Sequence, residues 1–129
     1  MRSIVRREQT PELFEKSIVI DLDDTICLAD QSILDIYEKY MSADVNESIV
    51  AGLKRLHKEG WYITIHTARH MKTCFNDADE AFARLGQFTA DWLDAHKIPF
   101  DQLIFGKPYG VFYIDDKAMS LHEFYTFSA

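Results

Sequence analysis

The sequence predicts an α/β protein, a three-layer α/β sandwich with a parallel sheet. Short apolar runs rich in β-branched residues indicate buried strands, and they occur at residues 18–20, 61–66, 103–105 and 111–114. Segments with apolar residues every three or four positions lie between most of these runs and predict helices. Strands that alternate with helices imply parallel pairing through right-handed crossovers.

The helices are expected at about residues 30–41, 46–59, 77–96 and 121–125. Asp30 is the expected N-cap of the first helix, whose apolar residues, from Ile33 to Met41, should face the core. Gly60 should stop the second helix. Before the first strand, Thr10 and Pro11 could start one helical turn.

Length and composition indicate one domain. The chain has 129 residues, of which 47% are hydrophobic and 27% charged, as is usual for a globular protein. We divide it into an N-terminal arm, residues 1–16, and a core, residues 17–129, that is too small to carry a separate lid domain. No apolar run approaches the ~20 residues of a membrane span, and no signal peptide is recognisable.

Net charge and cysteine content exclude several classes of protein. A formal net charge of −7 argues against a protein that binds nucleic acid over its whole surface. Cys27 and Cys74 are too few and too far apart for a disulfide framework or a zinc site. We therefore expect a cytoplasmic protein. The five histidines are not spaced as metal ligands usually are.

The first strand ends in a group of acids. Asp21, Asp23 and Asp24 follow the run 18–20, and Asp21 falls at the carboxyl edge of the sheet, where open α/β sheets bind ligands. Side chains alternate in an extended segment, so Asp21 and Asp23 should share one small space. Such a pair needs a shared proton or a bound cation. Alternatively, these acids only cap a helix that starts near Thr25.

Polar residues also follow the other predicted strands. Thr67 comes after the second strand, Lys107 after the third, and Asp115 with Asp116 after the fourth. Together with Asp21 and Asp23 they form a complete set for phosphoryl transfer through a covalent intermediate: a carboxylate nucleophile, a second carboxylate for proton transfer, a hydroxyl and an ammonium for the phosphate, and acids for a metal.

In these four motifs the chain resembles the Mg²⁺-dependent phosphatases of the haloacid dehalogenase (HAD) superfamily. The motifs are Ile-Val-Ile-Asp21-Leu-Asp23-Asp-Thr25, Ile-Thr-Ile-His-Thr67-Ala-Arg69, Gly-Lys107-Pro and Phe-Tyr-Ile-Asp115-Asp116. The resemblance implies a Rossmann-like core without a sizeable cap domain.

The resemblance also implies roles for individual residues. Asp21 would be the nucleophile and Asp23 the general acid and base, so Asp23 must hold a proton near neutral pH. The substrate phosphate would contact Thr67, Ala68, Arg69 and Lys107. Mg²⁺ would be held by Asp21, the Asp23 backbone carbonyl and Asp115 or Asp116. For Arg69 two readings stay open, a grip on the remote part of the substrate or an ion pair with a neighbouring acid.

The residues around the motifs also resemble small bacterial HAD proteins associated with capsule or lipopolysaccharide synthesis. The similar stretches are Thr67-Ala-Arg-His-Met, Asp91-Trp-Leu-Asp-Ala-His-Lys-Ile-Pro-Phe-Asp and Ile104-Phe-Gly-Lys-Pro-Tyr-Gly. The chain departs from those proteins in its N-terminal arm and in the helix at about residues 30–41. This resemblance implies a phosphomonoesterase that acts on a small phosphorylated metabolite such as a sugar phosphate.

Two other functions are kept as alternatives. A phosphatase without a cap could act on a protein or nucleic-acid end. A receiver-like phospho-switch also uses acids, a hydroxyl and a lysine, but receivers place the acids first, whereas here Asp115 and Asp116 come last. For an enzyme of small metabolites we hypothesise a homo-oligomer in which a neighbouring subunit covers the open site.

Overall fold

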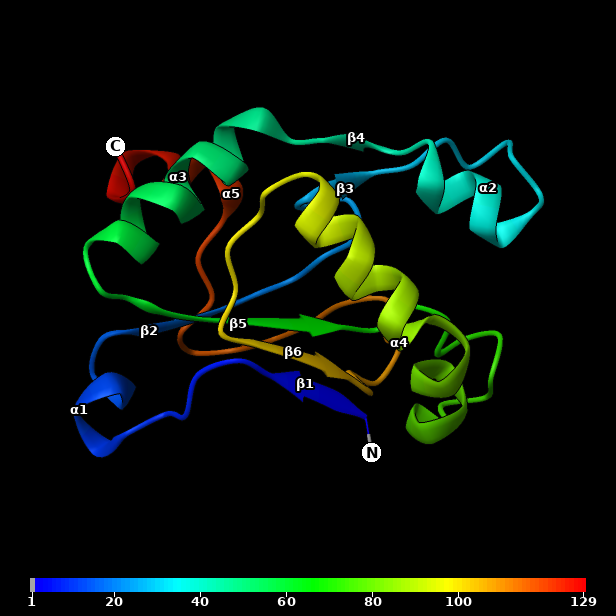
Figure 1. The fold of residues 1–129 in the computed structure, drawn as a ribbon, viewed down its shortest axis with the longest axis horizontal. Coiled ribbons are helices and arrows are strands. Elements are labelled where there is room, and N and C mark those ends of the chain that lie inside the picture. The colour runs from blue at the N-terminus through cyan, green and yellow to red at the C-terminus, as the bar shows by residue number, and fades with distance from the viewer. Residues whose placement is uncertain (1) are drawn as a thin grey trace.

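Figure 1 shows the computed structural model of the chain, which describes residues 2–129. Its main sheet has four strands in the order β1-β6-β5-β2. Strands β2 (Ser17–Ile20), β5 (Tyr62–Thr67) and β6 (Gln102–Phe105) pair in parallel, and β1 (Ser3–Val5) pairs antiparallel with β6. The prediction of an α/β fold with a mostly parallel sheet is confirmed.

Residues 2–16 contribute to this sheet through β1, which forms one of its edges. The helical turn expected at Thr10 and Pro11 is present as α1 (Pro11–Phe14), with Thr10 at the N-cap position and Pro11 in the first turn. Arg6 and Arg7 hold this segment to the core, because they form ion pairs with Asp94 and Asp101.

Three predicted helices form close to their expected positions. They are α3 (Glu47–Lys58), α4 (Ala78–Ala95) and α5 (Leu121–Phe127). Asn46 and Asp77 cap α3 and α4 by accepting hydrogen bonds from backbone N–H groups in the first turn. In Figure 1, α3 and α4 lie on the same side of the sheet and α5 lies beside α3. Their apolar faces and the strands enclose the core, which includes Leu22, Leu53, Ile63, Leu93 and Leu103.

The helix expected after Asp30 begins later and is less buried than predicted. The chain between β2 and α3 forms a ribbon of β3 (Cys27–Leu28) and β4 (Asp44–Val45), with α2 (Ile36–Met41) between them. The N-cap is Asp35, because Asp30 instead accepts hydrogen bonds from Ser32 in a local turn. In α2 only Tyr40 is buried, and Met41 is 67% exposed, so this helix does not present a full apolar face to the core.

The prediction of a fourth strand at residues 111–114 is wrong. No helix or strand occurs from residue 107 to residue 120, and Val111 and Ile114 are 80% and 99% exposed. Local hydrogen bonds fold the segment back on itself: the Tyr113 hydroxyl donates to the Pro108 carbonyl (2.7 Å) and accepts from the Gly110 N–H (3.3 Å). The edge of β2 therefore has no partner strand among the described residues, and Val19 is 69% exposed.

Within residues 2–129, no helix has both the length and the apolar character that crossing a bilayer requires.

Candidate functional site

A cavity of about 940 Å³ runs along β2, between this strand and the loop formed by residues 107–120. Most of its wall is apolar, but the end beside the carboxyl ends of β2, β5 and β6 carries Asp21, His66 and Lys107, and the loop adds Asp115 and Lys117 to the lining. A smaller hollow of about 440 Å³ is lined by Ser48, Ala51, Arg55 and Tyr125 and has no carboxylate. The charged end of the larger cavity is therefore the candidate site.

Asp21 leaves β2 at this end of the cavity. The loop that follows is anchored by Leu22 and Ile26, both fully buried, and the Leu22 carbonyl accepts hydrogen bonds from the Ile26 and Cys27 N–H groups. One Asp21 oxygen accepts a hydrogen bond from the Thr25 hydroxyl (3.3 Å). The other lies 3.5 Å from Lys107 Nζ. A rigid loop thus presents a carboxylate next to a cation.

Lys107 reaches Asp21 because the chain turns sharply after β6. Gly106 has a φ of 102°, and a Cβ on it would lie 2.7 Å from Ala78 Cβ, so only glycine fits this turn. The Lys107 N–H then donates to the Thr67 carbonyl (3.1 Å). Its ammonium lies 4.1 Å from the centre of the Tyr113 ring, a cation–π contact. Backbone and ring together hold the ammonium beside Asp21.

Arg69 forms an ion pair with Asp23. Of the two roles predicted for Arg69, the structure therefore has the ion pair with a neighbouring acid. Its side chain is fully buried, and it donates to both Asp23 oxygens, through Nη2 (2.7 Å) and Nε (3.1 Å). Nη1 donates to the hydroxyl of buried Thr89 (3.0 Å), and the guanidinium stacks 3.7 Å from the centre of the Tyr40 ring. Burial opposes the charge, but the hydrogen bonds and charge of Asp23 raise the Arg69 pKa.

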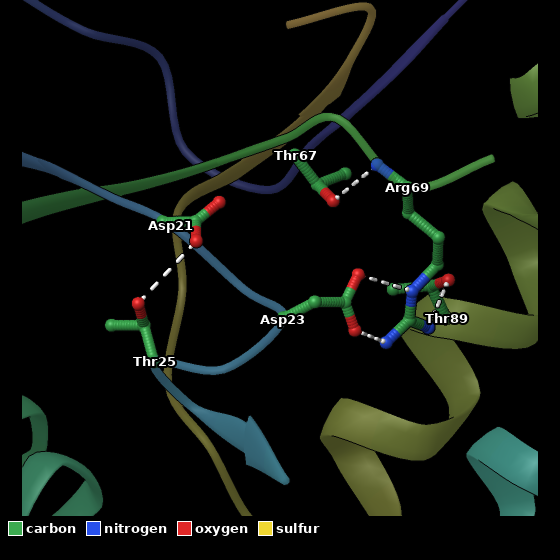
Figure 2. A network of polar contacts seen from close by, with 6 residues as sticks. All are labelled: Asp21, Asp23, Thr25, Thr67, Arg69 and Thr89. Atoms are coloured by element: carbon green, nitrogen blue, oxygen red, sulfur yellow. Dashed lines mark hydrogen bonds and ion pairs between the residues drawn. The ribbon is translucent and has the colours of Figure 1, made fainter. Parts of the chain in front are cut away.

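The expectation that Asp21 and Asp23 share one small space is wrong. Figure 2 shows the Asp23 carboxylate directed towards Arg69 and away from Asp21. Asp21 lines the cavity and Asp23 does not. Asp21 and Asp23 both lie beyond β2, which ends at Ile20, so the alternation of a paired strand need not continue through them. Each carboxylate has its own cation, Lys107 for Asp21 and Arg69 for Asp23.

Of the predicted phosphate-binding residues, the structure brings only Lys107 into the cavity. Thr67 is 1% exposed, and its hydroxyl oxygen accepts a hydrogen bond from the Arg69 N–H (2.9 Å) (Figure 2). Ala68 packs against the core. Thr67 and Ala68 therefore serve the turn after β5, and the Arg69 side chain is committed to Asp23.

Asp115 lines the same cavity as Asp21, whereas Asp116 does not line it. Both lie in the exposed loop, and Asp115 accepts a hydrogen bond from the Lys117 N–H (2.9 Å), which lowers the pKa of this carboxyl. Among residues 2–129, no three His, Cys, Asp or Glu side chains are placed to hold a metal ion together. The ligands implied by the HAD resemblance are carboxylates and a backbone carbonyl, oxygen donors that suit Mg²⁺, and two of the carboxylates, Asp21 and Asp115, line the same cavity, so the Mg²⁺ site stays a prediction.

His66 is a cavity residue that sequence patterns did not reveal. It is half-buried in β5 and lines the charged end together with Asp21 and Lys107. Burial and the nearby Lys107 cation lower the pKa of its imidazole, while Asp21 acts in the opposite direction. The strand alternation of residues 63–67 was a usable signal, since His66 falls on the opposite face from Ile65 and Thr67.

Comparison with solved structures finds a similar protein from Vibrio cholerae, whose crystal structure was determined as a structural genomics target. The two chains are 30% identical and superpose with a TM-score of 0.74, over 86% of this chain and 88% of the other. The chain belongs to the same family as this Vibrio cholerae protein. That structure's description names no activity, so the family relationship supports the α/β fold alone. No protein-family model matches the chain, and no curated protein matches it.

Proposed function

We propose that the chain is a phosphomonoester hydrolase of the HAD type, with a three-layer Rossmann-like core, that works through an aspartyl-phosphate on Asp21. The observation that carries the proposal is the pair formed by Asp21 and Lys107. An anchored carboxylate faces a cavity with an ammonium 3.5 Å away. This arrangement suits a nucleophile that must approach a phosphate dianion.

In the first step, an Asp21 oxygen attacks phosphorus and the bond from phosphorus to the leaving oxygen breaks. Lys107 offsets negative charge on the phosphate oxygens, and its position beside Asp21 lets it act on both groups. Asp23 is the proposed proton donor to the leaving oxygen. It can act only after its carboxylate separates from Arg69, because both of its oxygens accept hydrogen bonds from the guanidinium.

Mg²⁺ belongs to the proposal because the resemblance implies it. When bound, the ion would neutralise charge between Asp21 and the substrate. Among residues 2–129, no three His, Cys, Asp or Glu side chains are grouped to hold the ion, so we assign no step to it. A small sugar phosphate or related metabolite is the proposed substrate class.

A phosphate-release assay over a panel of phosphorylated metabolites tests this function. We expect continuous, Mg²⁺-dependent turnover of at least one small phosphate ester by the wild type, and none by Asp21→Asn. Asp79→Asn, in the exposed first turn of α4, is the matched control and should keep wild-type turnover.

The same assay separates the alternatives. Stoichiometric phosphorylation without continued release would favour the phospho-switch. Turnover of phosphopeptides or oligonucleotide ends, with none of small esters, would favour a phosphatase of macromolecular ends. Undiminished turnover by folded Asp21→Asn protein contradicts the proposed mechanism.

A further inference from the structure

We propose that two copies of this chain pair through the outer edge of β2, in antiparallel orientation, so that their main sheets join into one sheet beside the cavity. The dimer does not depend on the proposed reaction. It gives the homo-oligomer expected from the sequence a specific interface. The unpaired edge of β2, the direction of its backbone groups and the charges at its two ends support it.

The two edges of the main sheet differ in how they are protected. The strand order β1-β6-β5-β2 leaves β1 and β2 at the edges (Figure 1). β1 is three residues long and is followed by Arg6 and Arg7, charged residues of the kind that discourage edge pairing. β2 (Ser17–Ile20) contains no charge and no proline, and its Val19 is 69% exposed. The outer edge of β2 is therefore a template for a further strand.

The chain's own strand-like segment, residues 111–114, does not occupy this edge. A cavity of about 940 Å³ lies between β2 and the loop that carries the segment. In the part of the chain that the structure describes, none of the N–H groups of residues 111–114 donates to another backbone group. The Tyr113 side chain instead contacts Pro108 and Lys107 of the same loop. The edge of β2 thus stays open to a strand of another molecule.

The direction of the backbone groups in β2 selects a register. The Lys16 carbonyl accepts a hydrogen bond from the Tyr62 N–H (2.9 Å), so Lys16 turns its backbone groups towards β5. Because successive residues alternate, Ser17 and Val19 turn theirs outward. An antiparallel pair centred on Val19 of both copies sets outward groups opposite each other, as a two-fold axis requires. In this register Ser17 of one copy lies opposite Asp21 of the other.

The charges at the two ends of β2 make its edge complementary to itself. Lys16 precedes the strand, and Asp21 and Asp24 follow it. Lys16 and Asp24 are exposed and belong to none of the ion pairs among residues 2–129. Antiparallel pairing places Lys16 of each copy at the acidic end of the other β2, whereas parallel pairing would bring like charges together. A second copy is therefore the partner that this edge fits.

The apolar surface around the edge is large enough for a stable dimer. Six apolar side chains line the cavity and are 44% to 83% exposed: Phe14, Val19, Phe112, Tyr113, Met119 and Phe127. At roughly 200 Å² for a large apolar side chain, they expose on the order of 700 Å². A stable complex buries about 800 Å² on each partner. The backbone of the paired strands adds to this area, so the face meets the size that a dimer needs.

Pairing also encloses the candidate site. The strand of the second copy covers the apolar length of the cavity beside β2, and its amino end lies next to Asp21. The end of the cavity that carries Asp21 and Lys107 then faces protein on one more side. Exclusion of water strengthens electrostatic contacts in a site, so the dimer would supply an enclosure that the single chain does not.

Analytical ultracentrifugation of the full chain, without substrate, measures the association. We expect the wild type at about 100 μM to have twice the mass of the 15.0 kDa chain. Val19→Lys sets like charges opposite each other at the two-fold axis and should raise the dimer dissociation constant at least about 100-fold. Val5→Lys is the matched control and should keep the dimer, because Val5 is 50% exposed on the other edge strand, β1. Circular dichroism and thermal unfolding establish that each variant is folded.

Two further experiments test the register and the strand direction. A short thiol-specific cross-linker should join Val19→Cys into a covalent dimer and should not join Val5→Cys, since the two native cysteines are buried in both variants. Lys16→Glu should weaken association about 10-fold, because it brings like charges to each end of the paired strands. Adding Asp24→Lys should restore most of the affinity, because opposite charges then meet again.

A wild type that stays monomeric at about 100 μM overturns the dimer. Association that Val19→Lys leaves intact, or that Val5→Lys weakens equally, uses another surface and also overturns it. Failure to cross-link Val19→Cys, or no recovery on adding Asp24→Lys, overturns the antiparallel register. A monomer in which β2 and residues 111–114 are protected from hydrogen exchange would show that the chain covers its own edge. None of these measurements uses turnover, so their outcome leaves the proposed function to its own test.

Discussion

Two segments of this chain, each an apolar run that ends in aspartate, look alike in sequence but differ in structure. Residues 18–21 and 111–115 are both apolar runs that end in aspartate. The first is strand β2 and its anchored loop, where Leu22 is fully buried. The second is an exposed loop in which Ile114 is 99% exposed. The difference teaches that an apolar run followed by an acid becomes a site only when the neighbouring chain buries its apolar residues and supplies cations to its carboxylates.

The largest expected effect comes from comparing two lysines of the cavity lining, Lys107, which lies beside Asp21 at the end of the first segment, and Lys117, which follows the second segment. Lys107→Met should lower kcat/KM by about 1,000-fold, because it removes the cation 3.5 Å from Asp21. Lys117→Met, in the exposed loop, should lower it by less than about 10-fold. Steady-state kinetics on the best substrate of the panel measures both. Equal losses would mean that the loop is as much a part of the site as the turn after β6.

A stability comparison addresses the packing of the two segments. Leu22→Ala should lower the free energy of unfolding by about 3 kcal/mol, since it opens a cavity in the core. Ile114→Ser should change it by less than about 0.5 kcal/mol, because the side chain is 99% exposed. Denaturant unfolding of both variants provides the numbers. A loss for Ile114→Ser comparable to that for Leu22→Ala would show that residues 111–114 are packed in solution.

Comparing the two segments also shows which parts of the fold and of the site the sequence alone could predict. Local signals were enough for β2, for the starts of α3 and α4, and for bringing Asp21 and Lys107 together, because strand direction and turn residues follow from nearby sequence. Residues 111–114 have the composition of a strand, but a strand also needs a partner, and pairing is a tertiary property.

The missed and mistaken site residues have a similar cause. The motif that contains His66 gave this residue no role, and only the arrangement of β2, β5 and the loop shows that its face of the strand opens on a cavity. The Asp23 side chain was expected beside Asp21, yet Arg69, 46 residues further along the chain, turns it away. Sequence spacing alone does not reveal which of several acids a buried arginine will select.

The carboxylates that follow the two segments, Asp23 and Asp116, should also differ in how much they contribute to the free energy of unfolding. Asp23→Asn removes the counter-charge of the fully buried Arg69 and should cost about 3 kcal/mol of stability, reduced where water reaches the partly exposed carboxylate. Asp116→Asn removes an exposed charge and should cost less than about 0.5 kcal/mol. Thermal or denaturant unfolding at neutral pH measures both. Identical values would mean that the Arg69 contact does not persist in solution.

The smallest expected effect is a pH dependence of the free energy of unfolding, which comes from Cys27 in β3, next to the loop that follows Asp21. Burial raises the Cys27 pKa from 9.0 to about 11. The unfolded thiol therefore ionises at lower pH than the folded one, so the stability that Cys27 contributes is present below about pH 9 and is lost as pH rises towards 11. Unfolding curves between these values should show a steeper loss for wild type than for Cys27→Ala, with Cys74→Ala as control. Parallel curves would contradict the burial of this thiol.

The central claim, that Asp21 is a nucleophile, is tested most directly by locating the phosphate on the enzyme. The wild type is mixed with a turned-over substrate, quenched in acid at the time of maximal phosphoenzyme, digested, and its phosphopeptides identified by mass spectrometry. We predict an acid-stable, hydroxylamine-sensitive phosphate on Asp21, absent from Asp21→Asn. Phosphate on another residue, or turnover that never passes through a phosphoenzyme, would contradict the account.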